Sequence, residues 1–103
     1  MARLATGIWV SALLHRCDRQ AVPVYVLRRG DDTAGAVLVL QARRDGSTAL
    51  WAQEYDFDAD TRLWRVVADG PAADIAANAQ RQVGRDPDLW LIEVESDSAP
   101  ELD

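Results

Sequence analysis

Two arginines and a tyrosine are the side chains in this sequence best suited to bind a charged ligand. In the strand arrangement predicted below, Arg29, Tyr55 and Arg62 fall in one row at the end of a sheet. Two guanidinium groups beside a phenol can hold a carboxylate or a phosphate. A second interpretation is ordinary surface ion pairing, because five aspartates lie in the two loops at the same end: Asp31, Asp32, Asp56, Asp58 and Asp60.

Arg28 and Trp90 are two further candidates for binding an anion or a protein partner. Arg28 falls on the opposite face of the predicted sheet, in the row of Glu54, so we expect a salt bridge between them. Trp90 shares a strand face with Ile92 and Val94. It is therefore either a core residue or an anchor for a partner.

The residue counts exclude several kinds of catalytic site. The chain has no lysine, which removes Schiff-base and phosphate-loop chemistry. It has one histidine, His15, and one cysteine, Cys17, which are too few for a tetrahedral zinc site or a disulfide within one chain. On a helix these two side chains point about 200° apart, so they form no catalytic pair. We expect no cofactor and no metal, and we do not favour an enzyme.

One acidic segment is similar to a metal-binding motif but departs from it at two positions that matter. The segment 56–60 reads Asp-Phe-Asp-Ala-Asp, like the start of a calcium-binding EF-hand loop. The sixth position is Thr61 rather than glycine, and the twelfth is Val67 rather than glutamate. We interpret the segment as a turn kept soluble by its aspartates.

The charge distribution disfavours nucleic acid and membrane partners. Eleven arginines against 17 acids give a net charge of −6, and five of the acids lie in the last 11 residues, 93–103. The rest of the chain is close to neutral, so nothing attracts it to DNA or RNA. The apolar run 7–14 is far shorter than the roughly 20 residues of a membrane span. We expect a single cytoplasmic domain.

Hydrophobic periodicity and turn residues predict an α+β domain in the order α-β-β-β-β-α-β. We expect the first four strands to form an antiparallel meander, and the last strand to join the sheet through the second helix. The domain covers residues 1–95, and the acidic segment 96–103 is expected to be disordered. The predicted helices are 8–21 and 71–84, and the predicted strands are 24–29, 36–43, 48–55, 62–68 and 89–95.

The turn signals also predict which strand residues pair. Asp45-Gly46 indicates a two-residue hairpin turn, which would place Leu40 opposite Trp51. Pairing Tyr55 with Arg62 places Trp51 opposite Val66. Pairing Arg29 with Ala36 completes the row described above, and Trp51 and Trp64 then share one face.

Both faces of the predicted sheet are apolar, whereas an antiparallel sheet with one wet face alternates cleanly. Two alternatives follow. Either one helix covers each face, or an uncovered part of the sheet meets another chain. The second alternative predicts a homodimer or a subunit of a larger assembly.

Three blocks of sequence resemble a family of small bacterial proteins known as domain of unknown function 1491. They are residues 8–14, residues 25–31 with Ala34-Gly35, and residues 85–95, while the segment 53–62 carries little of the resemblance. The resemblance implies a single-domain cytoplasmic bacterial protein, and it implies no activity, cofactor or catalytic residue. It draws attention to the polar and aromatic residues within the matching blocks: Arg28, Arg29, Asp31, Asp86, Asp88 and Trp90.

The sequence favours a non-enzymatic protein-interaction module that self-associates or binds a protein partner. The alternative is a small-molecule or anion-binding protein, or a hydrolase, that uses Arg29, Tyr55 and Arg62. A concave pocket lined by these three side chains would favour the alternative.

Overall fold

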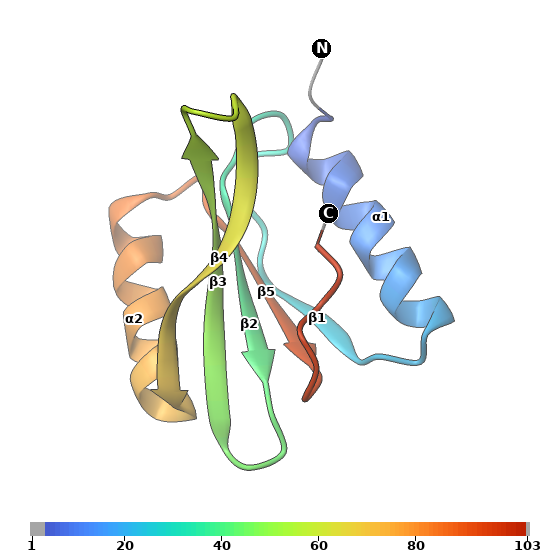
Figure 1. Cartoon of the computed structure of the whole chain (residues 1–103), viewed down its shortest axis with the longest axis vertical. Helices are drawn as coiled ribbons and strands as arrows, with labels where there is room; N and C mark the ends of the chain where they lie inside the picture. Colours follow the sequence, from blue (N-terminus) through green and yellow to red (C-terminus); the bar gives the residue numbers. More distant parts are fainter. Residues whose placement is uncertain (1–3, 103) are drawn as a thin grey trace.

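The computed structural model of the chain describes residues 4–102. The predicted α+β class and the predicted element order are both confirmed (Figure 1). The elements are α1 (Thr6–Arg19), β1 (Val24–Arg28), β2 (Val37–Ala42), β3 (Ser47–Asp56), β4 (Thr61–Pro71), α2 (Ala72–Arg85) and β5 (Trp90–Glu95). None of the helices in this described part is long and apolar enough to cross a membrane.

The five strands form one mixed sheet in the order β1-β5-β2-β3-β4. β5 joins through α2 and runs parallel to β2, as expected for a helical crossover. It lies between β1 and β2, however, so the prediction that β1 pairs with β2 is wrong, and the meander has only three strands. The physical reason is burial. β5 buries Trp90, Ile92 and Val94 on one face and Leu91 on the other, and a strand with buried side chains on both faces is most stable in the middle of a sheet.

The hairpin between β2 and β3 is one residue longer than predicted. The Arg43 N–H donates to the Ser47 carbonyl at 3.0 Å, and Gly46 takes a left-handed φ of 88°. The loop therefore has three residues and ends in a glycine bulge rather than a two-residue turn. As a result Trp51 lies opposite Val39, not Leu40.

The predicted pairing of β3 with β4 is confirmed. Tyr55 lies opposite Arg62, and Trp51 lies opposite Val66. Trp51 and Trp64 pack against the same core, so they share a face of the sheet.

One helix covers each face of the sheet, which is the first of the two alternatives (Figure 1). Apolar side chains therefore fill two separate layers on opposite sides of the strands. The layer under α1 includes Val10, Leu13, Val39, Ile92 and Val94. The layer under α2 includes Leu38, Leu40, Leu50, Ile75 and Leu91.

The C-terminal segment, which we expected to be disordered, packs on the α1 side of the sheet. Leu102 is only 3% exposed and belongs to the core under α1. The Arg16 guanidinium donates to the Glu101 carbonyl at 2.9 Å, and the Gln41 amide donates to the Ser96 carbonyl at 3.1 Å. Burial of one leucine and these hydrogen bonds outweigh the acidic, polar composition that suggested disorder.

Candidate functional site

The predicted row of Arg29, Tyr55 and Arg62 does not form. Because β5 separates β1 from β2, Arg29 lies away from the β3–β4 hairpin, where Tyr55 and Arg62 remain paired. Arg29 instead forms an exposed ion pair with Asp32 at 2.9 Å. Its guanidinium also lies over the Trp90 indole, 5.3 Å from the ring centroid. The structure therefore brings two of the three candidates together.

Arg28 on β1 and Trp90 on β5 make contacts within the chain. Arg28 donates to the Pro87 carbonyl at 2.9 Å, while Glu54 pairs with Arg65 at 3.1 Å, so the predicted bridge between Arg28 and Glu54 is wrong. Trp90 is 3% exposed, which fits the core interpretation and leaves little surface for a partner to contact.

Two loops from the sequence blocks that resemble the family are hydrogen-bonded to each other and closely packed. We call residues 30–35 and 86–90 together the loop clamp. The Asp31 N–H donates to the Asp88 carbonyl at 2.9 Å, and the Trp90 indole N–H donates to the Asp31 carbonyl at 2.8 Å. A Cβ atom at Gly30 or Gly35 would lie 2.2 or 2.5 Å from the Asp88 carbonyl oxygen. Only glycine, which has no Cβ atom, allows the two loops to approach this closely, so the contact explains the glycines at positions 30 and 35.

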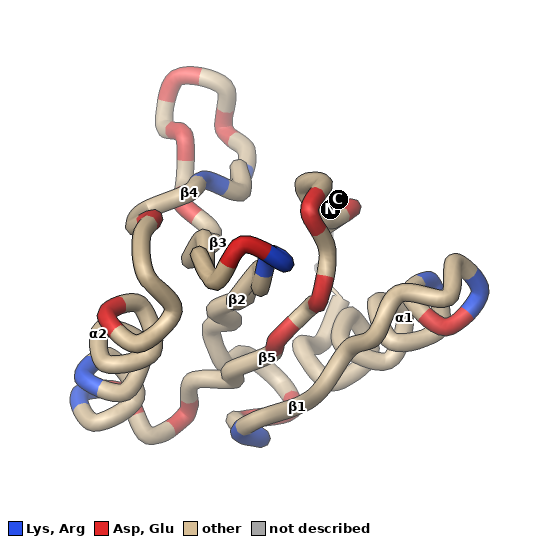
Figure 2. Tube along the Cα trace, turned by 90° about the horizontal axis from the view of Figure 1, so that it is seen from below, with Lys and Arg blue, Asp and Glu red and all other residues tan. Residues whose placement is uncertain are grey.

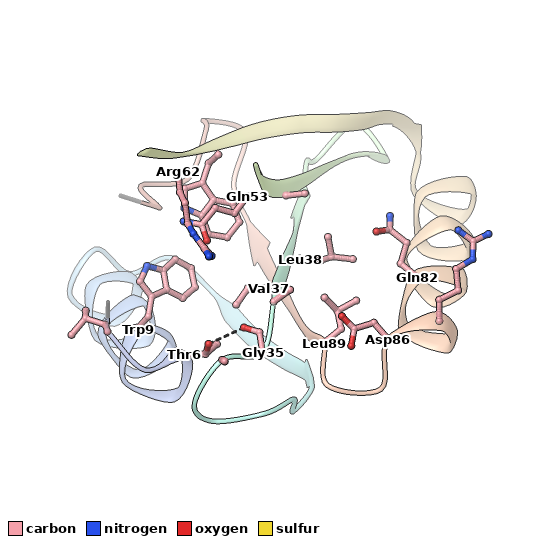
Figure 3. A pocket seen from close by; sticks show the side chains of 16 residues that line it. Thr6, Trp9, Gly35, Val37, Leu38, Gln53, Arg62, Gln82, Asp86 and Leu89 are labelled. Carbon is pink, nitrogen blue, oxygen red and sulfur yellow. Dashed lines mark hydrogen bonds between the residues drawn. The ribbon is translucent and has the colours of Figure 1, made fainter. Parts of the chain in front are cut away.

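Beside the loop clamp lies a hollow of about 840 Å³, which the sequence did not predict (Figure 3). We call it the β2–β3 groove. The paired part of β2 and β3 ends at Leu38 and Ala52, while β3 continues to Asp56 alongside β4 alone. The groove occupies the space that an earlier start of β2 would fill. Its floor is apolar and includes Val37 and Leu89.

The wall of the groove on the α1 side is aromatic. Trp9 and Trp64 stack with their ring centroids 5.3 Å apart and an interplanar angle of 22°. Arg62 extends from β4 toward Trp9 on this side (Figure 3). The Thr6 hydroxyl donates to the Gly35 carbonyl at 2.8 Å, which fastens the start of α1 to the loop clamp. Of these residues, Trp9 and Gly35 belong to the blocks that carry the resemblance.

The opposite wall is polar and comes from the end of α2. Gln82 and Asp86 line it (Figure 3), and Arg85 lies beside them. With Arg62 on the other side, the groove has an arginine on each wall above an apolar floor. This combination suits a ligand that has both acidic and apolar groups.

The upper edge of the groove is the backbone of β3. Backbone groups of alternate residues in an antiparallel strand point to the same side. Since the Ser47 carbonyl accepts a hydrogen bond from β2, the backbones of Gln53 and Tyr55 also face the side of β2. β2 begins at Val37, which lies opposite Gln53, and does not reach Tyr55, so β3 has an open sheet edge above the groove from Tyr55 onward.

The clearest electrostatic pair lies far from the groove, at the other end of the sheet. Arg43 binds Asp69 through two hydrogen bonds of 2.8 and 2.9 Å, and this contact lowers the pKa of the Asp69 carboxyl. Burial raises the pKa of the Cys17 thiol. Within residues 4–102 no three histidine, cysteine or acidic side chains are placed to share a metal ion.

The architecture defines a small α+β domain with a five-stranded mixed sheet and a helix on each face. The chain belongs to the family described as protein of unknown function, DUF1491, whose family model matches residues 4–102. The match includes the packed C-terminal segment through Leu102. No curated protein matches the chain.

Solved structures of family members share the fold. The crystal structure of a DUF1491 family protein from Caulobacter crescentus is 38% identical, covers 91% of this chain and 89% of its own, and has a TM-score of 0.83. An NMR structure of a DUF1491 family protein from the same organism is 33% identical, with coverages of 97% and 93% and a TM-score of 0.83. A solution structure of a protein from A. tumefaciens is 31% identical, with coverages of 98% and 92% and a TM-score of 0.81.

Proposed function

We propose that the protein is a non-enzymatic interaction module whose β2–β3 groove binds an extended peptide segment. The observation that carries this proposal is the open edge of β3 at Tyr55, directly above an apolar floor. An extended peptide can add to such an edge through backbone hydrogen bonds and place alternate side chains in the hollow below.

The residues around the groove support binding rather than catalysis. Among the described residues that line it, Asp86 is the one carboxylate, and none is a histidine, cysteine or serine. The Thr6 hydroxyl already donates to the Gly35 carbonyl. General acid–base catalysis needs a positioned proton donor or acceptor next to a reacting group, and this lining offers no such pair.

The walls indicate which peptide chemistry fits. Arg62 and Arg85 favour acidic side chains, and the stacked Trp9 and Trp64 favour an aromatic or aliphatic group. We therefore propose a partner segment that combines acidic residues with an aromatic one.

A small anionic molecule is the second candidate ligand. The hollow of about 840 Å³ falls within the usual range of small-molecule sites, about 300–1,000 Å³. Such a ligand would use the arginines and tryptophans but not the backbone edge of β3. Binding that depends on the edge therefore separates the two candidates.

Selection from a displayed library of random linear peptides tests the proposal. We expect enriched peptides to be acidic and aromatic, and to bind the purified chain measurably by calorimetry. Tyr55→Pro removes the backbone N–H that faces the groove, and it should weaken binding by about tenfold or more. Arg85→Glu, on the exposed end of α2, should weaken acidic peptides by a similar factor.

The matched control is Val66→Pro. Val66 lies opposite Trp51, so its backbone faces outward from the free edge of β4, away from the groove. We expect this variant to bind the selected peptides as the parent chain does, with folding checked by circular dichroism. Failure to enrich any peptide, or equal binding by Tyr55→Pro, would contradict the proposal.

A further inference from the structure

We infer that the groove binds the end of β3 and the hairpin tip that follows it in a second copy of this chain, with the strand end on the open edge and the tip in the hollow. The tip is residues 56–60, with the sequence Asp-Phe-Asp-Ala-Asp. This inference rests on the proposed function, because it names an occupant for the same groove. It makes the protein a dimer in which each copy gives its tip to the other.

The tip is exposed and already ordered for binding. Phe57 is 86% exposed, although Tyr55 contacts its ring edge-on at a centroid distance of 4.7 Å. The Asp56 carboxylate accepts the backbone N–H groups of Asp58 and Ala59 at 3.0 and 3.2 Å, which shapes the turn. Burying this phenylalanine stabilises a complex, and an ordered turn loses little conformational entropy on binding.

The tip also stands clear of the rest of the molecule. Figure 2 shows the loop between β3 and β4 projecting away from both helices, with acidic residues along it. A projecting loop can enter a hollow on another molecule without rearrangement of either fold.

The chemistry of the tip matches that of the groove. The tip has three carboxylates around one aromatic ring. The groove has an arginine on each wall, Arg62 and Arg85, and the stacked indoles of Trp9 and Trp64. Opposite charges therefore meet locally, although the whole chain carries a net charge of −6.

The strand directions bring the tip to the groove. β2 runs antiparallel to β3 and leaves the edge of β3 open beyond Ala52. When the β3 strand of a second copy pairs antiparallel with the first, so that the two Tyr55 residues lie opposite each other, it lies in line with β2. The partner's tip, which turns after Asp56, then reaches the hollow beside Val37 and Gln53, which line the groove. Two identical antiparallel segments are related by a two-fold axis, so the arrangement closes as a dimer.

β1, one of the two outer strands of the sheet, is a weaker candidate for self-association. β1 also exposes apolar side chains, including Tyr25 and Leu27. It has only five residues, however, and its register with β5 shifts between Val26 and Arg28. Short edge strands with a bulge resist pairing with another edge.

Sedimentation velocity of the full chain across a range of concentrations tests the inference. We expect a concentration-dependent dimer. Phe57→Ser should raise its dissociation constant by about tenfold or more, because an exposed aromatic that becomes buried at an interface contributes strongly to binding. The matched control, Leu27→Ser, changes a similarly exposed residue on β1 and should leave the dimer intact.

A charge exchange tests the same contact in a second way. Asp58→Arg and Arg85→Asp should each weaken the dimer, and the chain with both changes should recover part of the loss because the charges again complement each other. Recovery in the double variant supports the pairing of tip with groove, whereas additive losses would contradict it.

Two results would overturn the inference. The first is a chain that stays monomeric at every concentration. The second is a dimer that Leu27→Ser disrupts and Phe57→Ser does not, which assigns the contact to β1. In either case the proposed function stands if library peptides still bind the parent chain and fail to bind Tyr55→Pro, so the two failures are distinguishable.

Discussion

The loop clamp and the β3–β4 hairpin lie at the same end of the sheet and are built in opposite ways. In the clamp, backbone and indole groups are joined by hydrogen bonds, and Gly30 and Gly35 touch the Asp88 carbonyl. In the hairpin, Phe57 and Tyr55 are exposed, and the edge of β3 has no neighbouring strand beyond the start of β2. The clamp is closely packed and hydrogen-bonded, whereas the hairpin has exposed aromatic side chains and a strand edge without a neighbour.

This contrast changes how the resemblance blocks are interpreted. Arg29, Asp31, Asp88 and Trp90 drew attention as candidates for function, but the structure uses them to hold two loops together. The hairpin segment, which carries little of the resemblance, has the exposed side chains and the open strand edge to which we assign binding. Loops on a rigid scaffold often carry function.

Gly30→Ala should break the clamp and produce the largest loss of stability. Its Cβ would lie 2.2 Å from the Asp88 carbonyl oxygen and 2.7 Å from the Leu89 carbonyl carbon, so the backbone must shift. We expect a loss of about 2–3 kcal/mol in the free energy of unfolding, measured with urea.

Gly70→Ala is the control for this prediction. A Cβ atom at Gly70 would have no neighbour within 4 Å, and the residue has no positive φ. Its free energy of unfolding should stay within about 0.5 kcal/mol of the parent value. A Gly30→Ala chain as stable as Gly70→Ala would show that the two loops are not tightly packed.

Leu102→Ala should cost about 2 kcal/mol, because it leaves a cavity in the core under α1. Ile8→Ala, at an exposed position of α1, should change stability little. Urea unfolding of both variants compares the packed C-terminal segment with ordinary surface. Equal stability of the two variants would mean that the segment does not belong to the core.

Trp90→Phe should have a smaller effect within the clamp. The change keeps an aromatic ring in the core but removes the indole N–H that donates to the Asp31 carbonyl at 2.8 Å. We expect a loss of about 1–2 kcal/mol, since the carbonyl is left with one fewer donor. Amide hydrogen exchange should become faster across residues 30–35, and unchanged exchange there would argue against the clamp as a unit.

Asp69→Asn should have the smallest effect, and one that depends on pH. Its hydrogen bonds with Arg43 hold the pKa of Asp69 in the folded chain below the ordinary value of 3.8. Folding therefore favours the charged carboxylate. The stabilisation is present above the ordinary pKa and is lost as the pH falls through the lower folded-state pKa.

The measurement for Asp69→Asn is urea unfolding at neutral pH and at several acidic pH values. The difference in stability between the parent and the variant should shrink toward the acidic end. A difference that stays constant with pH would mean that the Arg43–Asp69 pair does not contribute to the pH dependence of the free energy of unfolding.

Local signals in the sequence predicted the elements and one of the strand pairings. The acidic loop 56–61 between the predicted strands suggested pairing Tyr55 with Arg62, and the structure confirms this pairing. The Asp45-Gly46 signal located the other hairpin but not its length. A three-residue loop with a bulge at Gly46 uses the same residues and moves Trp51 from Leu40 to Val39.

The groove was not predictable because it depends on contacts between distant segments. It exists because β5 inserts beside β2 and because β2 starts at Val37, several residues short of the end of β3. Trp9 and Trp64 are 55 residues apart and meet only through this topology. Neither periodicity nor turn chemistry indicates such a meeting.

The most direct test of the central claim is an amide proton–nitrogen correlation spectrum of the labelled Phe57→Ser chain, titrated with a synthetic peptide of residues 55–62. This variant keeps the groove and should be largely monomeric. We predict shifts at Gly35, Val37 and Gln53 and at the indole N–H groups of Trp9 and Trp64. A spectrum that does not change, or that changes only at β1, would contradict the claim that the groove binds an extended acidic and aromatic segment.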